Sequence, residues 1–225
     1  MRWSLLVLVA CGNAAPATDP IAVHVDHRLE ASAIVERLAG KEEWHKAQDC
    51  AYVRDVDAAF APFATHPAVA KMRDFGFERG PRDALEGHQV PLDDFIKAAD
   101  TEAFFASHAA YLASVEAAFR AAIPGAKISA FLTREFGTLP AFQVNPSLLQ
   151  GPENYGLPGR ALVGLGEVDA ACLPKHVDLD LVVHEMSHGT VNPLIDGAGL
   201  DAVAEKLFAS VRTQMQAQHY ATPRI

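Results

Sequence analysis

The sequence predicts an α+β fold in which helical segments come first, a small sheet follows, and a further helix packs on that sheet. Two observations support this prediction. As far as residue 123, apolar residues recur mostly at helical spacing. Beyond residue 125 the apolar segments become short and are bounded by Gly, Pro and Asn, which is typical of strands. Helices and strands that are grouped rather than alternating indicate an α+β arrangement.

In the first half of the chain one strand and five helices are expected. Ile21 to Val25 alternates weakly and is predicted to be a strand, and Leu29 to Leu38 has helical spacing. The longest helix is expected over residues 102–123, with Thr101 as its N-cap and Gly125 at its end. The shorter helices are expected over residues 55–63, 67–75 and 92–98.

In the second half, strands are expected over residues 127–133, 139–144 and 160–165. The apolar run from Leu179 to Val183 begins the next helix. Asn192-Pro193 is expected to stop that helix, because a residue before proline disfavours the helical conformation. A last helix is expected over residues 200–216. We expect the sheet and the long helix to share one core, so that residues 21–225 form a single domain.

The first twenty residues have the pattern of an export signal followed by a tether. Met1-Arg2 is a short positive region, and Trp3 to Val9 is an apolar run too short to span a bilayer. Leu8-Val9-Ala10-Cys11 resembles the bacterial lipobox, in which the cysteine is lipidated. We therefore expect a signal over residues 1–11, lipidation of Cys11, a tether over residues 12–20 and a location in the cell envelope. Plain secretion and a cytoplasmic chain with an apolar start are the alternatives.

The overall charge limits the classes of partner. The 19 basic and 28 acidic residues give 19 − 28 = −9. This balance argues against nucleic acid as a partner, and the sequence contains no basic patch for anionic lipid. Contact with a membrane is expected only through the lipid anchor. The composition does not indicate an oligomeric state.

The most informative motif is His184-Glu185-Met186-Ser187-His188, which has the form H-E-x-x-H. Two histidines four residues apart on a helix lie on one face, so both rings can reach one metal ion. Glu185 falls beside them, where it can take a proton from a zinc-bound water. The motif therefore predicts a Zn²⁺ hydrolase, usually a peptidase, with His184 and His188 as ligands and Glu185 as the catalytic base. A surface helix with two solvated histidines is the alternative.

A third protein ligand is expected, because catalytic zinc normally has three. The metzincin pattern fails, since Val191 and Leu194 occupy its glycine and last histidine positions. Among the later acids, Asp196 and Asp201 lie in or beside a Gly-rich turn and are expected to be capping groups. Glu205, on the last predicted helix, is the candidate ligand, and a solvated helix residue is an equal alternative.

Two cysteines remain when Cys11 is set aside. Cys50 and Cys172 can pair in an oxidising compartment, whereas two buried free thiols are the simpler expectation. The sequence does not show whether their Cα atoms are close enough for a bond.

The motif and its continuation through Asn192-Pro193-Leu194 resemble an uncharacterised bacterial family, described as a domain of unknown function. Its members carry H-E-[FM]-S-H followed by N-P and are often lipoproteins. Asp26 to Leu38 and Phe60 to Lys71 look similar to it as well. The resemblance implies a gluzincin-like metallopeptidase fold, which belongs to the zincin-like class, with a lipid anchor. It implies zinc on His184 and His188, with Glu185 as the base.

The same resemblance implies an acidic residue on a helix well beyond the N-P pair, followed by more chain. This sequence ends at Ile225. Three explanations stay open: Glu205 is the ligand, the ligand lies past the end in a longer gene product, or this copy is a degraded homologue.

Three functions follow as expectations. The first is a zinc-dependent peptidase of the bacterial cell envelope that acts on a peptide or protein. By analogy with zincins, the strand near Ala161 to Leu165 would present an edge to an extended substrate. The second is a catalytically inactive lipoprotein that keeps the fold as a binding or scaffolding module. A hydrolase of another envelope bond is a third, weaker expectation, because H-E-x-x-H does not specify the bond.

Overall fold

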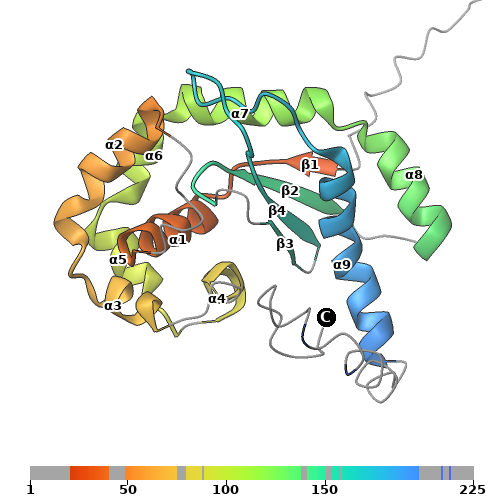
Figure 1. Cartoon of the computed structure of the whole chain (residues 1–225), viewed down its shortest axis with the longest axis horizontal. Coiled ribbons are helices and arrows are strands. Elements are labelled where there is room, and N and C mark those ends of the chain that lie inside the picture. Colours follow the sequence, from red (N-terminus) through yellow and green to blue (C-terminus); the bar gives the residue numbers. More distant parts are fainter. Residues whose placement is uncertain are drawn as a thin grey trace, which may run out of the picture.

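A small mixed sheet lies at the centre of the fold, with helices around it (Figure 1). This computed structural model describes residues 21–40, 49–74, 80–87, 89–137, 141–150, 154–157 and 159–197, together with residues 209 and 213. Within these residues the sheet has the strand order β1-β2-β4-β3. β1, β2 and β4 run parallel, and β3 is antiparallel to β4. The strands are β1 (Ile21–Val23), β2 (Phe142–Ser147), β3 (Asn154–Leu157) and β4 (Arg160–Gly164).

Most of the helices gather beyond the carboxyl ends of the parallel strands, on the left in Figure 1. This helical layer consists of α1 (His27–Leu38), α2 (Ala51–Phe60), the short 3₁₀ helix η2 (Ala61–Phe63), α3 (Pro67–Arg73), α4 (Gly80–Glu86), α5 (Leu92–Ala98) and α6 (Thr101–Ser107). The other helices are α7 (Ala109–Ala122), α8 (Gly125–Phe136) and α9 (Leu179–Gly197). No helix in the described part of the chain is long and apolar enough to cross a membrane.

α1 is the central helix of the helical layer. It begins after Asp26, whose carboxylate accepts hydrogen bonds from the backbone N–H groups of Arg28 and Leu29. Leu29, Ile34 and Val35 are fully buried. One hydrophobic cluster runs from these side chains through the sheet to α9, so the helical layer and the sheet share a core.

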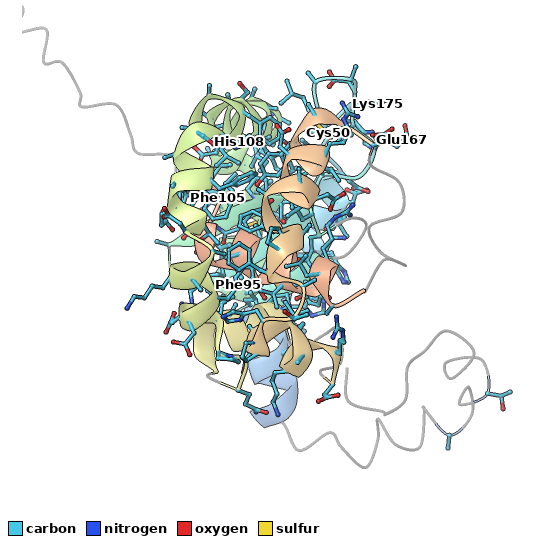
Figure 2. All side chains as sticks on the ribbon, turned by 90° about the vertical axis from the view of Figure 1, so that its left-hand side faces the viewer. Cys50, Phe95, Phe105, His108, Glu167 and Lys175 are labelled. Atoms are coloured by element: carbon cyan, nitrogen blue, oxygen red, sulfur yellow. A yellow bond between two sulfur atoms is a disulfide. The ribbon has the colours of Figure 1, made fainter. Side chains whose placement is uncertain are left out.

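Aromatic side chains fill the space between the helices of this layer. Phe60 lies between Phe95 and Phe104, with ring centroids 6.1 and 5.0 Å away. Figure 2 looks onto the layer and shows Phe95 and Phe105 between its helices. His108 stacks on Phe104 at 4.2 Å. Such pairs stabilise beyond simple area burial, by about 0.5–1.5 kcal/mol each.

α1 also carries a buried carboxyl group, that of Glu30. The group accepts hydrogen bonds from the hydroxyls of Ser147, at 2.5 Å, and Tyr52, at 3.2 Å. It also accepts one from the backbone N–H of Leu149. Burial nevertheless raises the pKa of Glu30 to about 7. Burial and the nearby Glu30 raise the pKa of Tyr52 well above its usual range, so Tyr52 remains a donor.

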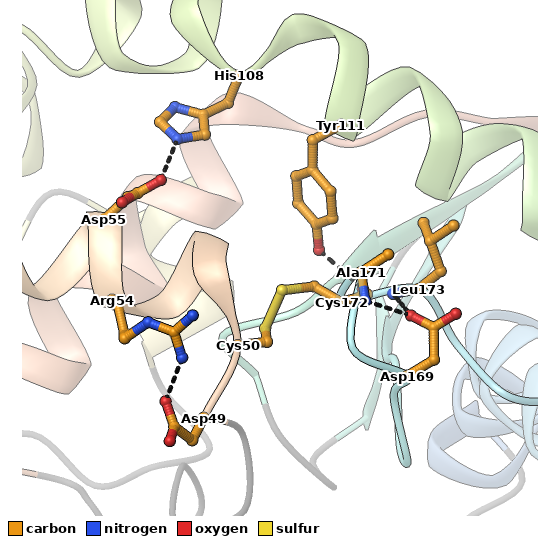
Figure 3. Close-up of a disulfide and its surroundings, with 10 residues drawn as sticks. All are labelled: Asp49, Cys50, Arg54, Asp55, His108, Tyr111, Asp169, Ala171, Cys172 and Leu173. Carbon is orange, nitrogen blue, oxygen red and sulfur yellow. Dashed lines mark hydrogen bonds and ion pairs between the residues drawn. A yellow bond between two sulfur atoms is a disulfide. The ribbon is translucent and has the colours of Figure 1, made fainter.

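A disulfide joins the helical layer to the loop between β4 and α9. Cys50 and Cys172 have their Cα atoms 5.6 Å apart and are separated by 122 residues in sequence. Both are buried. Figure 3 shows the bond beside Tyr111, whose hydroxyl donates to the Cys172 carbonyl at 3.1 Å. The expectation of two free thiols is therefore wrong, and no local sequence signal indicated that residues so far apart would meet.

The loop that carries Cys172 is itself well ordered by internal bonds. The Asp169 carboxylate accepts from the backbone N–H groups of Ala171 and Leu173. Val168 and Pro174 form a β-bridge, and Lys175 forms an ion pair with Glu167 at 3.2 Å. Figure 2 shows that ion pair at the upper edge of the molecule, close to Cys50. The loop thus connects the disulfide to the start of α9.

Several predicted elements are confirmed, and others are wrong. The predicted helices near residues 29–38 and 92–98 are confirmed, as are the strands near residues 21–25 and 160–165. The strand predicted over residues 127–133 is helix α8, because Ile128 and Leu132 are buried at helical spacing. The helix predicted over residues 102–123 is broken at His108 into α6 and α7. The N-cap of α6 is Asp100 rather than the predicted Thr101.

Candidate metal centre

α9 carries the H-E-x-x-H motif and packs on β3 and β4. Val182 and Met186 are fully buried, and Leu179 and Val183 are partly buried against the same hydrophobic cluster. The Asp178 carboxylate accepts from the backbone N–H of Leu181 at the start of the helix, as an N-terminal capping group does. The prediction that the apolar run from Leu179 to Val183 begins a helix is confirmed.

The two histidines of the motif converge at one point above this helix. Their Nε2 atoms are 3.1 Å apart, and their rings are perpendicular, at 88°. Two nitrogens bound to one tetrahedral zinc ion at 2.0–2.1 Å would be about 3.3 Å apart. The observed separation is close to that value, so the His184 and His188 side chains fit a shared metal ion.

Glu185 lies on the flank of the same helix. Its side chain is only 8% exposed, against 28% for His188, and its Oε2 is 3.9 Å from His188 Nε2. His184 is exposed to solvent. The ligand atoms of the three residues all lie within 4.8 Å of one another. The cluster therefore combines two accessible imidazoles with a shielded carboxylate.

A glycine of the neighbouring strand allows α9 to approach so closely. A Cβ atom at Gly156 would lie 2.3 Å from His188 Cβ and 2.4 Å from the Glu185 carbonyl oxygen. Real atoms do not come this close, so a side chain at Gly156 and the present position of α9 are incompatible. β3 therefore runs directly beside the motif.

A cavity of about 200 Å³ lies one turn before the motif along α9. Leu181 forms part of its wall, and it precedes Glu185 by four residues, or about 6 Å along the helix axis. Phe119 and Val163 provide further apolar lining, from α7 and β4. The polar lining groups belong to Asn154, His176 and Asp178.

Some predicted site residues fall outside the described part of the chain. These are Cys11 and Glu205, together with the last predicted helix apart from isolated residues. α9 continues through Pro193 to Gly197, so the predicted stop at Asn192-Pro193 is wrong. Asp196 consequently belongs to this helix rather than to a turn.

The strand that was expected to present an edge is not at the edge of the sheet. β4, which contains Ala161, lies between β2 and β3 and is hydrogen-bonded to both. β3 occupies the edge position beside α9. It was missed in the sequence because it has four residues, one of them glycine, and so resembles part of a loop.

Other histidines have structural partners in their own surroundings. His24, His27 and His108 pair with Glu116, Glu102 and Asp55, respectively. His66 caps α3. His176 lines the cavity rather than joining the histidine pair. Among the described residues, the metal-ligand cluster that contains histidines is that of His184, Glu185 and His188.

Comparison of the chain with protein-family models, with curated proteins and with solved structures finds no match.

Proposed function

We propose that this chain is a zinc-dependent metallopeptidase of the bacterial cell envelope. The observation that carries the proposal is the 3.1 Å approach of the two motif Nε2 atoms, with the buried Glu185 carboxylate beside them. His184 and His188 would hold the ion. Bound there, zinc would supply a Lewis acid that polarises a carbonyl and acidifies water.

The Glu185 carboxylate would act as the catalytic base. Its Oε2 would accept the proton of the attacking water and then pass it to the departing amine nitrogen. Its burial next to an open histidine pair keeps this group close to the reacting atoms and away from bulk solvent. The Glu185→Gln side chain has nearly the same shape and cannot perform this transfer.

The surroundings of the motif favour an extended peptide as the substrate. β3 is the edge strand next to α9, so its backbone would pair with a substrate strand, the role first expected of β4. The cavity beside Leu181 would take an apolar side chain close to the bond that is cleaved. A helix, a small mixed sheet and an antiparallel edge strand in this arrangement are compatible with a zincin-like fold.

The Cys50–Cys172 disulfide supports a location outside the cytoplasm. Disulfides persist in oxidising compartments and are rare in the cytosol. This agrees with the export signal and lipidation of Cys11 inferred from the sequence. We propose that the lipid is the protein's contact with the membrane.

The proposal is tested with the full chain, by measuring zinc content and cleavage of casein or peptide mixtures with and without a chelator. Glu185→Gln should retain zinc and lose cleavage by about 10²–10⁴-fold. His188→Ala should lose both. Glu135→Gln, at an exposed side chain of α8, is the matched control and should behave as the unaltered protein. Full activity in Glu185→Gln would reject Glu185 as the base.

The number of protein ligands to the metal favours a second function, that of an inactive binding or scaffolding module. Among the described residues the cluster offers two histidines and the glutamate assigned as base. Without a third ligand the chain would be an inactive binding or scaffolding module. Less than about 0.2 zinc per chain after gentle purification would support this function, because a three-ligand site retains its ion.

A further inference from the structure

Asn192 lies one turn beyond His188 on the same face of α9. Its Oδ1 is 3.3 Å from His188 Nδ1. This contact exists because the helix continues past Asn192 to Gly197 rather than stopping at Pro193. Residues 184, 188 and 192 are spaced by four, so their side chains follow one another along the helix with a small rotation.

The contact bears on which ring nitrogen of His188 carries the proton. A neutral imidazole has one N–H, on either Nδ1 or Nε2. Ligation through Nε2 requires a lone pair there, so the proton must lie on Nδ1 and needs an acceptor. The Asn192 Oδ1 atom lies at that position. If the Asn192 Nδ2 group faced His188 Nδ1 instead, it would donate to that nitrogen. The ring proton would then lie on Nε2, which could not bind a metal ion.

We propose that Asn192 is a positioning residue of the metal centre. It accepts the His188 Nδ1–H bond, holds the ring in the ligating tautomer and keeps Nε2 directed at His184 Nε2, 3.1 Å away. His184 Nδ1 has no comparable acceptor among the residues that the structure describes. Of the two histidines, His188 is therefore the one whose ring is held in place before a metal ion binds. This inference rests on the proposed function, but it concerns the His188 ring rather than hydrolysis.

Zinc affinity is the first test. Competition with a chromophoric chelator would be measured for Asn192→Leu, which removes the acceptor, and for Asn192→Asp, which keeps an oxygen in its place. Asn192→Leu should weaken zinc binding by about 10–100-fold, the usual effect of losing such a partner. Asn192→Asp should stay close to the unaltered protein.

Ser187→Ala is the matched control. It removes a hydroxyl of the same helix that donates to the Val183 carbonyl at 2.7 Å rather than to a histidine ring. It should leave zinc affinity unchanged. Equal zinc affinity in Asn192→Leu and the unaltered protein would overturn the proposal, and so would equal losses in Asn192→Leu and Ser187→Ala.

The tautomer of His188 is the second test, and it needs no metal. Long-range ¹H–¹⁵N spectra of the metal-free protein would be recorded at about pH 8.5, where a free imidazole is neutral. The unaltered chain and Asn192→Asp should show the Nδ1–H form, whereas Asn192→Leu should shift toward Nε2–H. An Nε2–H form in the unaltered chain would overturn the inference. A chain that shows Nδ1–H but binds no zinc would contradict the proposed function alone.

Discussion

At the scale of single residues, Glu30 makes stability depend on pH. Its pKa is about 7 in the folded protein, against 4.5 ordinarily, so the folded state binds the proton more tightly than the unfolded state. Stability from this group is greatest below about pH 4.5, falls as pH rises toward 7, and is lost above it. A pKa difference of this size corresponds to about 3 kcal/mol in the free energy of unfolding.

Glu30→Gln should remove this dependence. Urea unfolding at several pH values should find the variant more stable than the unaltered protein near pH 8, by up to about 3 kcal/mol. The advantage should vanish near pH 4.5. Glu135→Gln, with an exposed side chain, is the control and should leave the profile unchanged. An identical pH profile in Glu30→Gln would contradict a raised pKa.

The motif residues could be predicted from the sequence because one helix arranges them. The spacing of His184 and His188 fixes their relative direction once the helix forms. Asn192 and Glu30 could not be identified in this way. Asn192 preceded a proline and therefore indicated a helix end, and Glu30 looked like an ordinary charge in the first turn of α1. Their roles depend on neighbours that only the folded chain supplies.

At the scale of elements, the contact between β3 and α9 depends on Gly156. Gly156→Ala would force the two apart, because the added Cβ would lie 2.3 Å from His188 Cβ. We expect a loss of about 1–3 kcal/mol in unfolding free energy and weaker zinc binding. Gly189→Ala is the comparison, since its Cβ would come no closer than 3.3 Å to the Leu157 carbonyl oxygen. Equal effects of the two substitutions would contradict this account.

Elements with strong apolar periodicity were predictable, and those defined by their neighbours were not. α5 and β4 have clear local patterns. α8 differs from the predicted strand because a short apolar run such as that near Ile128 does not by itself distinguish a helix from a strand. β3 has too few residues for a periodic signal, and its antiparallel pairing with β4 is a property of the sheet.

At the scale of the whole molecule, the disulfide should contribute strongly to stability. A bond across 122 residues removes chain entropy from the unfolded state worth about 5 kcal/mol by the loop-closure argument. The Cys50→Ala/Cys172→Ala double variant should therefore unfold at markedly lower urea concentration. Reductant should destabilise the unaltered protein and leave the double variant unchanged. A double variant as stable as the oxidised protein would contradict this role.

The same bond changes the topology of the covalent chain. Residues 50 to 172 form a closed ring that contains most of the helical layer, while β1, α1 and α9 lie on the two arms outside it. A single proteolytic cut within the ring therefore opens it without separating any piece. The arm that bears α9 would remain covalently joined to the arm that bears β1 and α1.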